Sequence, residues 1–210
     1  MISVGKLKKP EAIVSAAMDA VGKMKQYSSN RFSKYKIGEH CALGAMRCGL
    51  INSGDSMGWA PQVTATREAE EKRFWEQIAI QRTNGDIFFT GKSGAIEFVD
   101  VKNKAWISEK SLSDFRNDGW FFIDAWYRPT NADYAQGARK SMPCFIRACD
   151  DFKEFARENF ERTKRRKDGH WGYEITVNKI KPEWLMEDFD PIQYTKFMRE
   201  VWDLYYHHLS

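Results

Sequence analysis

A chain of 210 residues, 42% hydrophobic and 14% aromatic, is long enough for one substantial core and short for two full domains. With 33 Lys and Arg against 29 Asp and Glu, its net charge of +4 is too small to establish a nucleic-acid partner. The composition excludes a largely disordered chain, and four cysteines are too few for a disulfide scaffold.

The expected setting is cytoplasmic and reducing. The lysine-bearing segment 1–10 is not followed by the apolar core of a secretory signal. No stretch approaches the roughly 18 apolar residues that cross a bilayer, so we expect a soluble protein without a membrane partner. The cysteines lack zinc-knuckle spacing, which favours buried free thiols over a distant metal site with His40 or His170. They are Cys41, Cys48, Cys144 and Cys149.

The first half of the chain predicts helices and one irregular segment. A helix is predicted at 10–26, where Pro10 suits a first turn and apolar residues recur at helical spacing. The Ser- and Gly-rich segment 28–62 predicts irregular structure with one short helix at 40–48. A longer helix is predicted at 64–82, before a turn at Asn84-Gly85.

The second half predicts strands followed by helices. Two strands, 86–90 and 95–102, flank the glycine-bounded loop 91–94 of a hairpin. The remaining predictions are a helix at 108–117, a strand at 120–127, a polar loop at 128–141, a strand at 143–149, a helix at 150–164, a strand at 173–178 and a helix at 191–209.

This order predicts an α+β fold rather than a regular βαβ repeat. We expect one compact domain overall. Its core would span 64–180, with a helical and irregular extension at 1–63 and a helical extension at 181–210.

The predicted hairpin concentrates the residues that carry chemistry. Side chains alternate along a strand, so Asp100 and Lys102 share a face with Ile96 and Phe98. A four-residue loop pairs the start of one strand with the end of the next, which brings Asp86 near that pair if the register allows. The alternative is a surface hairpin on which Asp100 and Lys102 form an exposed ion pair that contributes little to stability.

Two carboxylates and a lysine suit phosphodiester hydrolysis. Carboxylates bind Mg²⁺, which polarises a phosphoryl group and helps generate hydroxide. A lysine beside the ion orients water or stabilises developing negative charge. A third acid from the preceding helix would be Glu71 or Glu76. Glu71 is preferred because Phe74, Trp75 and Ile78 follow it at helix-face spacing.

The segment Gly-Asp-Ile, a glycine hairpin and Ile-Glu-Phe-Val-Asp-Val-Lys resembles the PD-(D/E)xK nuclease superfamily. The resemblance covers about 64–166 and implies a restriction-endonuclease-like core of helix, mixed sheet and helix. It assigns Asp86 and Asp100 as ligands of Mg²⁺ or Mn²⁺, Lys102 as the lysine and Glu71 as the supporting acid. Gly85 replaces the proline expected before the first acid, and Asp replaces the commoner Glu at position 100.

The nuclease interpretation makes nucleic acid, with DNA favoured, the expected partner. Basic residues on segments that flank the site would contact its backbone: Lys104, Lys110, Arg128, Arg139 and Lys140. A homodimer formed through a terminal helix is possible. Two rivals stay open: a non-catalytic nucleic-acid-binding or assembly protein of the same fold, and a partner-binding protein that uses the aromatic run at 120–127.

Overall fold

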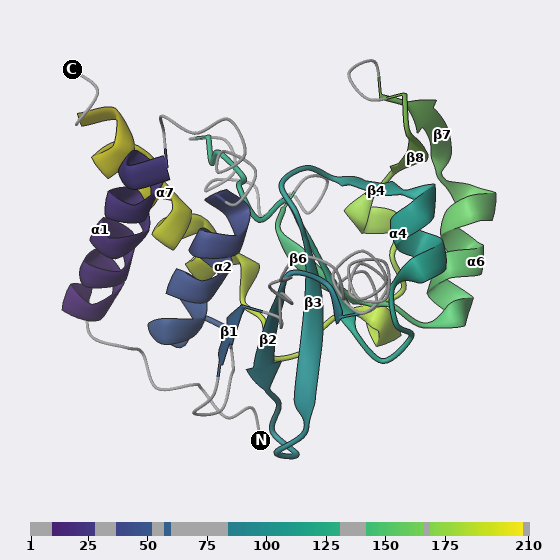
Figure 1. The fold of residues 1–210 in the computed structure, drawn as a ribbon, viewed down its shortest axis with the longest axis horizontal. Helices are drawn as coiled ribbons and strands as arrows, with labels where there is room; N and C mark the ends of the chain where they lie inside the picture. The colour runs from purple at the N-terminus through teal and green to yellow at the C-terminus, as the bar shows by residue number, and fades with distance from the viewer. Residues whose placement is uncertain are drawn as a thin grey trace, which may run out of the picture.

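Aromatic and β-branched runs form a five-stranded mixed sheet in the centre of the computed structural model (Figure 1). Neighbouring strands are antiparallel, except that β3 and β5 run parallel. Because parallel neighbours need a crossover, the chain passes between them through helix α4, Glu109–Asp114. In spatial order the strands are β1 Met57–Trp59, β2 Ile87–Thr90, β3 Ile96–Lys102, β5 Trp120–Ile123 and β6 Cys144–Arg147.

The structure describes residues 10–27, 37–51, 57–59, 84–130, 142–165 and 169–207. Several predictions lie outside these ranges: the helix at 64–82 with Glu71 and Glu76, and the loop residues Arg139 and Lys140. Within the described ranges, no helix combines the length and apolarity that a membrane crossing requires.

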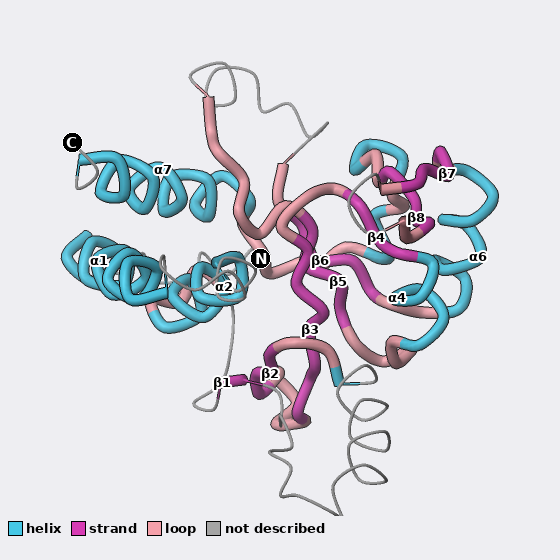
Figure 2. The backbone as a smooth tube through the Cα atoms, turned by 45° about the horizontal axis from the view of Figure 1, so that its top comes forward, coloured by secondary structure: helices cyan, strands magenta, loops and turns pink. Residues whose placement is uncertain are grey.

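Helices cover both faces of the sheet (Figures 1 and 2). One face carries α1 Pro10–Tyr27, α2 Ile37–Arg47 and α7 Pro191–His207, and the other carries α4 and α6 Asp150–Asn159. The terminal helices α1 and α7 both pack into the core of the sheet. A homodimer formed through either of them stays a prediction.

The alternation of side chains along β5 divides the core in two. Phe122 enters the cluster formed with α1, α2 and α7, whereas Phe121 and Ile123 enter the cluster formed with α4 and α6. Phe145 of β6 stacks on Phe122, with ring centroids 4.1 Å apart. The aromatic run that suggested a binding surface is therefore mostly core.

A smaller sheet of order β4-β8-β7 stands beside α4 and α6 (Figure 1). Its strands are β4 Trp106–Ser108, β8 Trp171–Glu174 and β7 Glu161–Lys164. All its pairings are antiparallel. Two short 3-10 helices, η3 Val177–Lys179 and η4 Pro182–Trp184, lead from β8 to α7.

The predicted α+β class, with a mixed sheet flanked by helices, is confirmed. The predicted helices at 10–26, 40–48 and 191–209 correspond to α1, α2 and α7. The hairpin strands and the strand at 143–149 correspond to β2, β3 and β6.

The predicted helix at 150–164 is too long. It ends at Asn159, and Phe160 takes an extended conformation with its ring in the core. Residues 161–164 then pair with β8 as a strand. Packing of Phe160 into the core and pairing of residues 161–164 with β8 override local helix propensity here.

The predicted strand at 120–127 is also too long, and β4 was not predicted. The strand ends at Ile123 because Asp124 has a φ of 56° and its carbonyl accepts the Tyr127 N–H in a turn. The predicted strand at 173–178 begins earlier, as β8, and its end becomes η3.

Candidate active site on the β2–β3 hairpin

The hairpin brings Asp86 against β3. The loop 91–94 closes it in a register that pairs Ile87 with Val99. The Asp86 N–H donates to the Val99 carbonyl at 2.8 Å, and the Asp86 Oδ2 accepts the Val101 N–H at 2.8 Å. Asp86 therefore lies beside the Asp-x-Lys segment. The sequence predicts this position if the strands pair in a suitable register.

Asp100 and Lys102 point to the face of the sheet that α4 covers. Asp100 is 9% exposed, and the Lys102 Nζ lies 2.6 Å from its Oδ1. The same Nζ donates to the Ser111 Oγ of α4 at 2.9 Å. The Ser108 side chain caps α4 by accepting the Ser111 N–H. The ammonium group is thus held between the strand and a capped helix end.

Among the charged groups that act on Asp86, two are acids and one is a lysine. Burial raises the pKa of Asp86 well above its ordinary value, and the charges of Asp100 and Glu39 raise it further. The Lys102 ammonium and the Val101 N–H act in the opposite direction without overcoming these causes. A cation placed here would relieve the excess negative charge.

Glu39 was not among the predicted site residues. It lies in the first turn of α2, one residue before the helix expected at 40–48. A Cβ on the adjacent Gly38 would lie 1.9 Å from Asn103 Oδ1 and 3.1 Å from the Ala125 Cβ. Glycine therefore lets the start of α2 approach the ends of β3 and β5 closely. This contact brings the charge of Glu39 to Asp86.

The residues present fit a hard divalent cation with few protein ligands. Within the described ranges, no group of three or more His, Cys, Asp or Glu side chains is arranged as a ligand set. Mg²⁺ keeps several waters and commonly takes only one or two carboxylates together with substrate phosphates. Asp86 and Asp100 are the two carboxylates that would serve, and Glu39 adds negative charge nearby.

Glu97, the other acid of β3, has hydrogen-bonding and charged partners within the protein. It accepts a hydrogen bond from the Trp120 Nε1 and lies 3.3 Å from the Arg147 Nη1. The Arg147 guanidinium also covers the Trp120 ring at 4.9 Å. This carboxylate ties together β3, β5 and β6.

The three described residues predicted to contact nucleic acid lie in different surroundings. Lys110, in the first turn of α4, lines a groove that begins at the site. Lys104 is exposed between β3 and β4. Arg128 packs over the Trp202 and Tyr206 rings of α7, at 5.7 and 4.8 Å. Lys110 is the member of this set that adjoins Lys102 in a common hollow.

Asp124 is a buried acid that the sequence did not single out. It is 8% exposed, and burial raises its pKa to about 7 although it accepts the Ala105 N–H. The next residue, Ala125, donates its N–H to the Lys102 carbonyl at 3.0 Å. Asp124 thus fixes the turns beyond β3 and β5.

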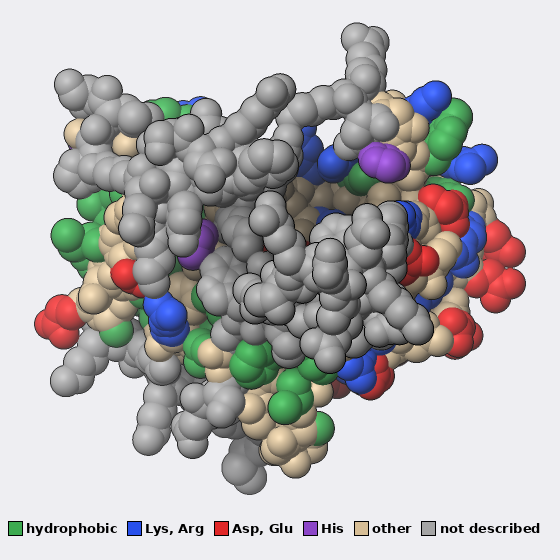
Figure 3. Space-filling model, in the orientation of Figure 1, with side chains coloured by type: hydrophobic (Ala, Val, Ile, Leu, Met, Phe, Trp, Pro, Cys, Tyr) green, Lys and Arg blue, Asp and Glu red, His purple; other side chains and the backbone are tan. Residues whose placement is uncertain are grey.

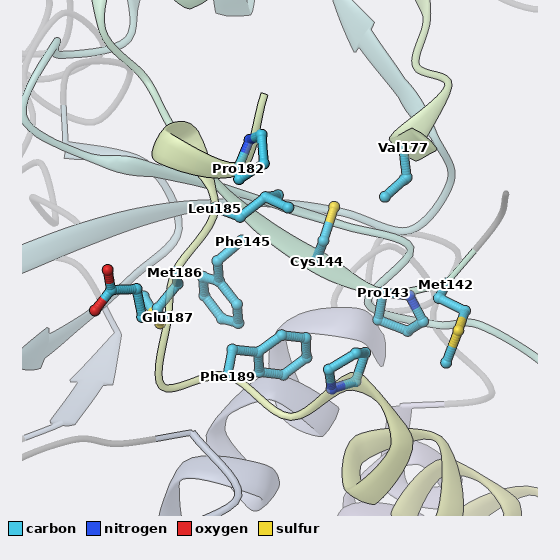
Figure 4. A pocket seen from close by; sticks show the side chains of 11 residues that line it. Met142, Pro143, Cys144, Phe145, Val177, Pro182, Leu185, Met186, Glu187 and Phe189 are labelled. Carbon is cyan, nitrogen blue, oxygen red and sulfur yellow. The ribbon is translucent and has the colours of Figure 1, made fainter. Parts of the chain in front are cut away.

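A second cavity, of about 240 Å³, is apolar (Figure 4). Cys144 and Phe145 of β6 form one wall, facing Leu185 and Phe189 from the segment before α7. Glu187 is the one charged side chain among its described lining residues. Most of its described lining is therefore apolar.

The cysteines are free thiols. Cys41, Cys48 and Cys144 are buried and Cys149 is partly buried. Burial raises the pKa of the Cys41 and Cys144 thiols far above the ordinary value. The interpretation as buried free thiols is confirmed for the three buried residues.

Comparison of the chain with protein-family models, with curated proteins and with solved structures finds no match in any of the three.

Proposed function

We propose that the chain is a nuclease that hydrolyses phosphodiester bonds, with DNA as the favoured substrate, at Asp86, Asp100 and Lys102. The observation that carries this proposal is the contact of Asp86 with β3. Its carboxylate accepts the N–H of Val101, the residue between the two members of the Asp-x-Lys pair. Asp86, one residue before β2, thereby lies against the strand that carries Asp100 and Lys102, which supports the grouping that the resemblance to PD-(D/E)xK nucleases implies.

Asp86 and Asp100 would hold Mg²⁺ or Mn²⁺ through carboxylate oxygens. When bound, such an ion polarises a phosphoryl group and lowers the pKa of coordinated water. The raised pKa of Asp86 supports this role, because a divalent cation would offset the effect of burial and of the neighbouring Asp100 and Glu39 charges.

Lys102 would orient the attacking water or stabilise charge on the phosphoryl oxygens. An ammonium group has three N–H donors. Asp100 and Ser111 take two of them, which leaves one for water or substrate. Because both contacts come from ordered elements, the lysine is held in place before the substrate arrives.

The order of elements also supports the proposal. Among the described residues, helix α2, the antiparallel strands β1, β2 and β3, strand β4 of the small sheet, helix α4 and the parallel strand β5 occur in this order. This order is compatible with the helix, mixed sheet and helix that the resemblance implies. It assigns the leading helix to α2, so we propose Glu39 as a supporting acid, while the role of Glu71 stays a prediction.

Cleavage assays on three substrates test the proposal. Supercoiled plasmid, linear duplex and single-stranded DNA would be incubated with Mg²⁺ or Mn²⁺ and with wild type, Asp100→Ala or Lys102→Ala. We expect cutting that needs the ion and is lost in both variants. Asp118→Asn is the matched control, because Asp118 pairs with Arg116 outside the site and its loss should leave cutting intact.

The ion pair of Lys102 with Asp100 favours one rival function. A lysine that neutralises the neighbouring acid suits a non-catalytic nucleic-acid-binding protein that needs no metal ion. This rival predicts binding in EDTA that survives Asp100→Ala, together with no cutting of any substrate by folded wild type. That pair of results would replace the nuclease proposal.

A further inference from the structure

A groove leads from the candidate site to the small sheet β4-β8-β7. Two adjoining hollows form it, with volumes of about 330 and 570 Å³. They share Ser108, Lys110 and His170 as lining residues. The first begins at Lys102, and the second ends at Trp171. Strands distant from the hairpin in sequence therefore extend the site along one path.

Basic side chains outnumber acidic ones among the described lining residues. Glu109 is one of two acids, and it is engaged by Arg157 at 3.0 Å and by the Tyr173 hydroxyl at 2.7 Å. Lys and Arg side chains gather around the hollow near β7 and β8 (Figure 3). Such a groove attracts a polyanion. The charged lining residues are Lys102, Lys110, Arg162 and Arg165, with Glu109 and Asp114.

Arg165 is held in position at the middle of the groove. Its guanidinium lies 3.9 Å from the centroid of the Trp106 ring, whose Nε1 donates to Thr163 at 3.0 Å. Its backbone closes a turn with His170 and with Gly169, which has a φ of 71°. Because this side chain is already stacked, binding a phosphate through it costs little further conformational entropy.

Trp171 supplies an aromatic surface at the outer end. It is 45% exposed, although indole rings are usually well buried. The β7–β8 register places Lys164 opposite Trp171, and Arg162 follows on the same face. Their charged groups lie 5.7 and 4.9 Å from the ring centroid. An exposed ring beside cations suits one base and the phosphates that flank it.

From the groove's charge and the exposed indole beside cations we infer that it binds a single unpaired nucleic-acid strand, with Trp171 stacked on a base and Arg165 on a phosphate. A base must be unpaired from its complement to stack on the Trp171 ring, which favours a single strand over a duplex. Sequence-tolerant recognition of single strands combines a basic groove with aromatic stacking in this way. The inference extends the proposed function to a class of substrate. It rests on that proposal only in treating Lys102, at the inner end of the groove, as part of the active site.

Binding without metal tests this inference separately from cleavage. Full-length protein in EDTA would be titrated against a fluorescent oligothymidine and against a duplex of equal length, with folding checked by circular dichroism. We expect Trp171→Ala to weaken binding of the single strand about ten-fold and to leave duplex binding nearly unchanged. Trp171→Phe should retain most of the affinity, because a phenyl ring still stacks.

Arg165→Ala should weaken single-strand binding and reduce its dependence on salt. The matched control is Lys181→Ala. Lys181 is an exposed cation over the Trp184 ring, at 4.7 Å, and it does not line the groove. Its loss removes the same charge and should leave both the affinity and the salt dependence close to wild type.

The two proposals fail in different ways. If Trp171→Ala and Arg165→Ala bind the single strand like wild type, or lose single strand and duplex equally, the groove inference is overturned even where metal-dependent cleavage is observed. If these variants lose single-strand binding as expected but wild type cuts nothing, the groove inference stands and the nuclease proposal falls.

Discussion

Two carboxylates of one hairpin, Glu97 and Asp86, have opposite surroundings. Glu97 has an indole N–H and a guanidinium as partners, so its charge is compensated by the protein. Asp86 accepts one backbone N–H and has two further acids as electrostatic neighbours. Glu97 therefore holds strands together, whereas Asp86 is maintained at a cost to stability. An acid whose pKa is raised by burial and by neighbouring acids marks a functional site better than burial alone.

The largest expected contrast is in activity. Asp86→Asn keeps the acceptor for the Val101 N–H but removes a charged ligand, so metal-dependent cleavage should fall by at least about a hundred-fold. Glu97→Gln should stay within a few-fold of wild type, because Glu97 contacts Trp120 and Arg147 rather than the site. Initial rates of plasmid nicking would measure both. Equal losses in the two variants would contradict the distinction.

Divalent cations should stabilise the wild type and not Asp86→Asn. An ion that binds the folded state alone adds about 2.7 kcal/mol at a concentration one hundred times its Kd. Thermal unfolding in EDTA, Mg²⁺ and Mn²⁺ would show an increase in Tm for wild type and Glu97→Gln. An unchanged Tm in wild type at saturating ion would argue that Asp86 and Asp100 hold no cation.

The smallest expected effect is on the free energy of unfolding in the absence of metal. Substitution of Asp86 and of Glu97 should change it in opposite directions. Asp86→Asn should raise the free energy of unfolding by about 1 kcal/mol near pH 7, because it removes the cost of burying a carboxylate and its repulsion with Asp100 and Glu39. Glu97→Gln should lower it by about 1 kcal/mol through loss of the contact with Arg147. Denaturant titrations in EDTA would measure both.

The gain from Asp86→Asn should depend on pH. A pKa raised in the folded state means that folding binds protons, so wild-type stability falls as pH rises from the ordinary Asp range through the raised value. The advantage of the variant should vanish in acid and grow toward neutral pH. Asp124, with its pKa near 7, contributes a similar slope to both proteins and cancels in the comparison. A gain that is constant with pH would show that charge repulsion is not its cause.

Local pattern predicted the hairpin and its acids, because turn chemistry and a four-residue loop limit the possible registers. The approach of Glu39 depends instead on Gly38 packing against Asn103 and Ala125, which lie far away in the chain. The spacing of residues within one helix carries no information about that contact. Local spacing therefore predicted Glu71 as the third acid, on a predicted helix that lies outside the described residues.

The small sheet was missed for a similar reason. Residues 161–164 are polar and charged and show no alternation of apolar side chains, so local propensity favoured extending the helix. Their strand partner is β8, and β8 in turn pairs with β4, more than fifty residues earlier in the chain. Arg165, directly after this segment, is linked to the candidate site because it lines the same hollow as Lys102.

The central claim is that a carboxylate at position 100 acts with Asp86 to support metal-dependent hydrolysis. Plasmid cleavage in Mn²⁺ by Asp100→Glu and Asp100→Asn, prepared alongside wild type, tests it most directly. The account predicts measurable cutting by Asp100→Glu, which keeps a metal-binding carboxylate, and none by Asp100→Asn, which keeps the shape without the charge. Cutting by Asp100→Asn at the wild-type rate would contradict the account.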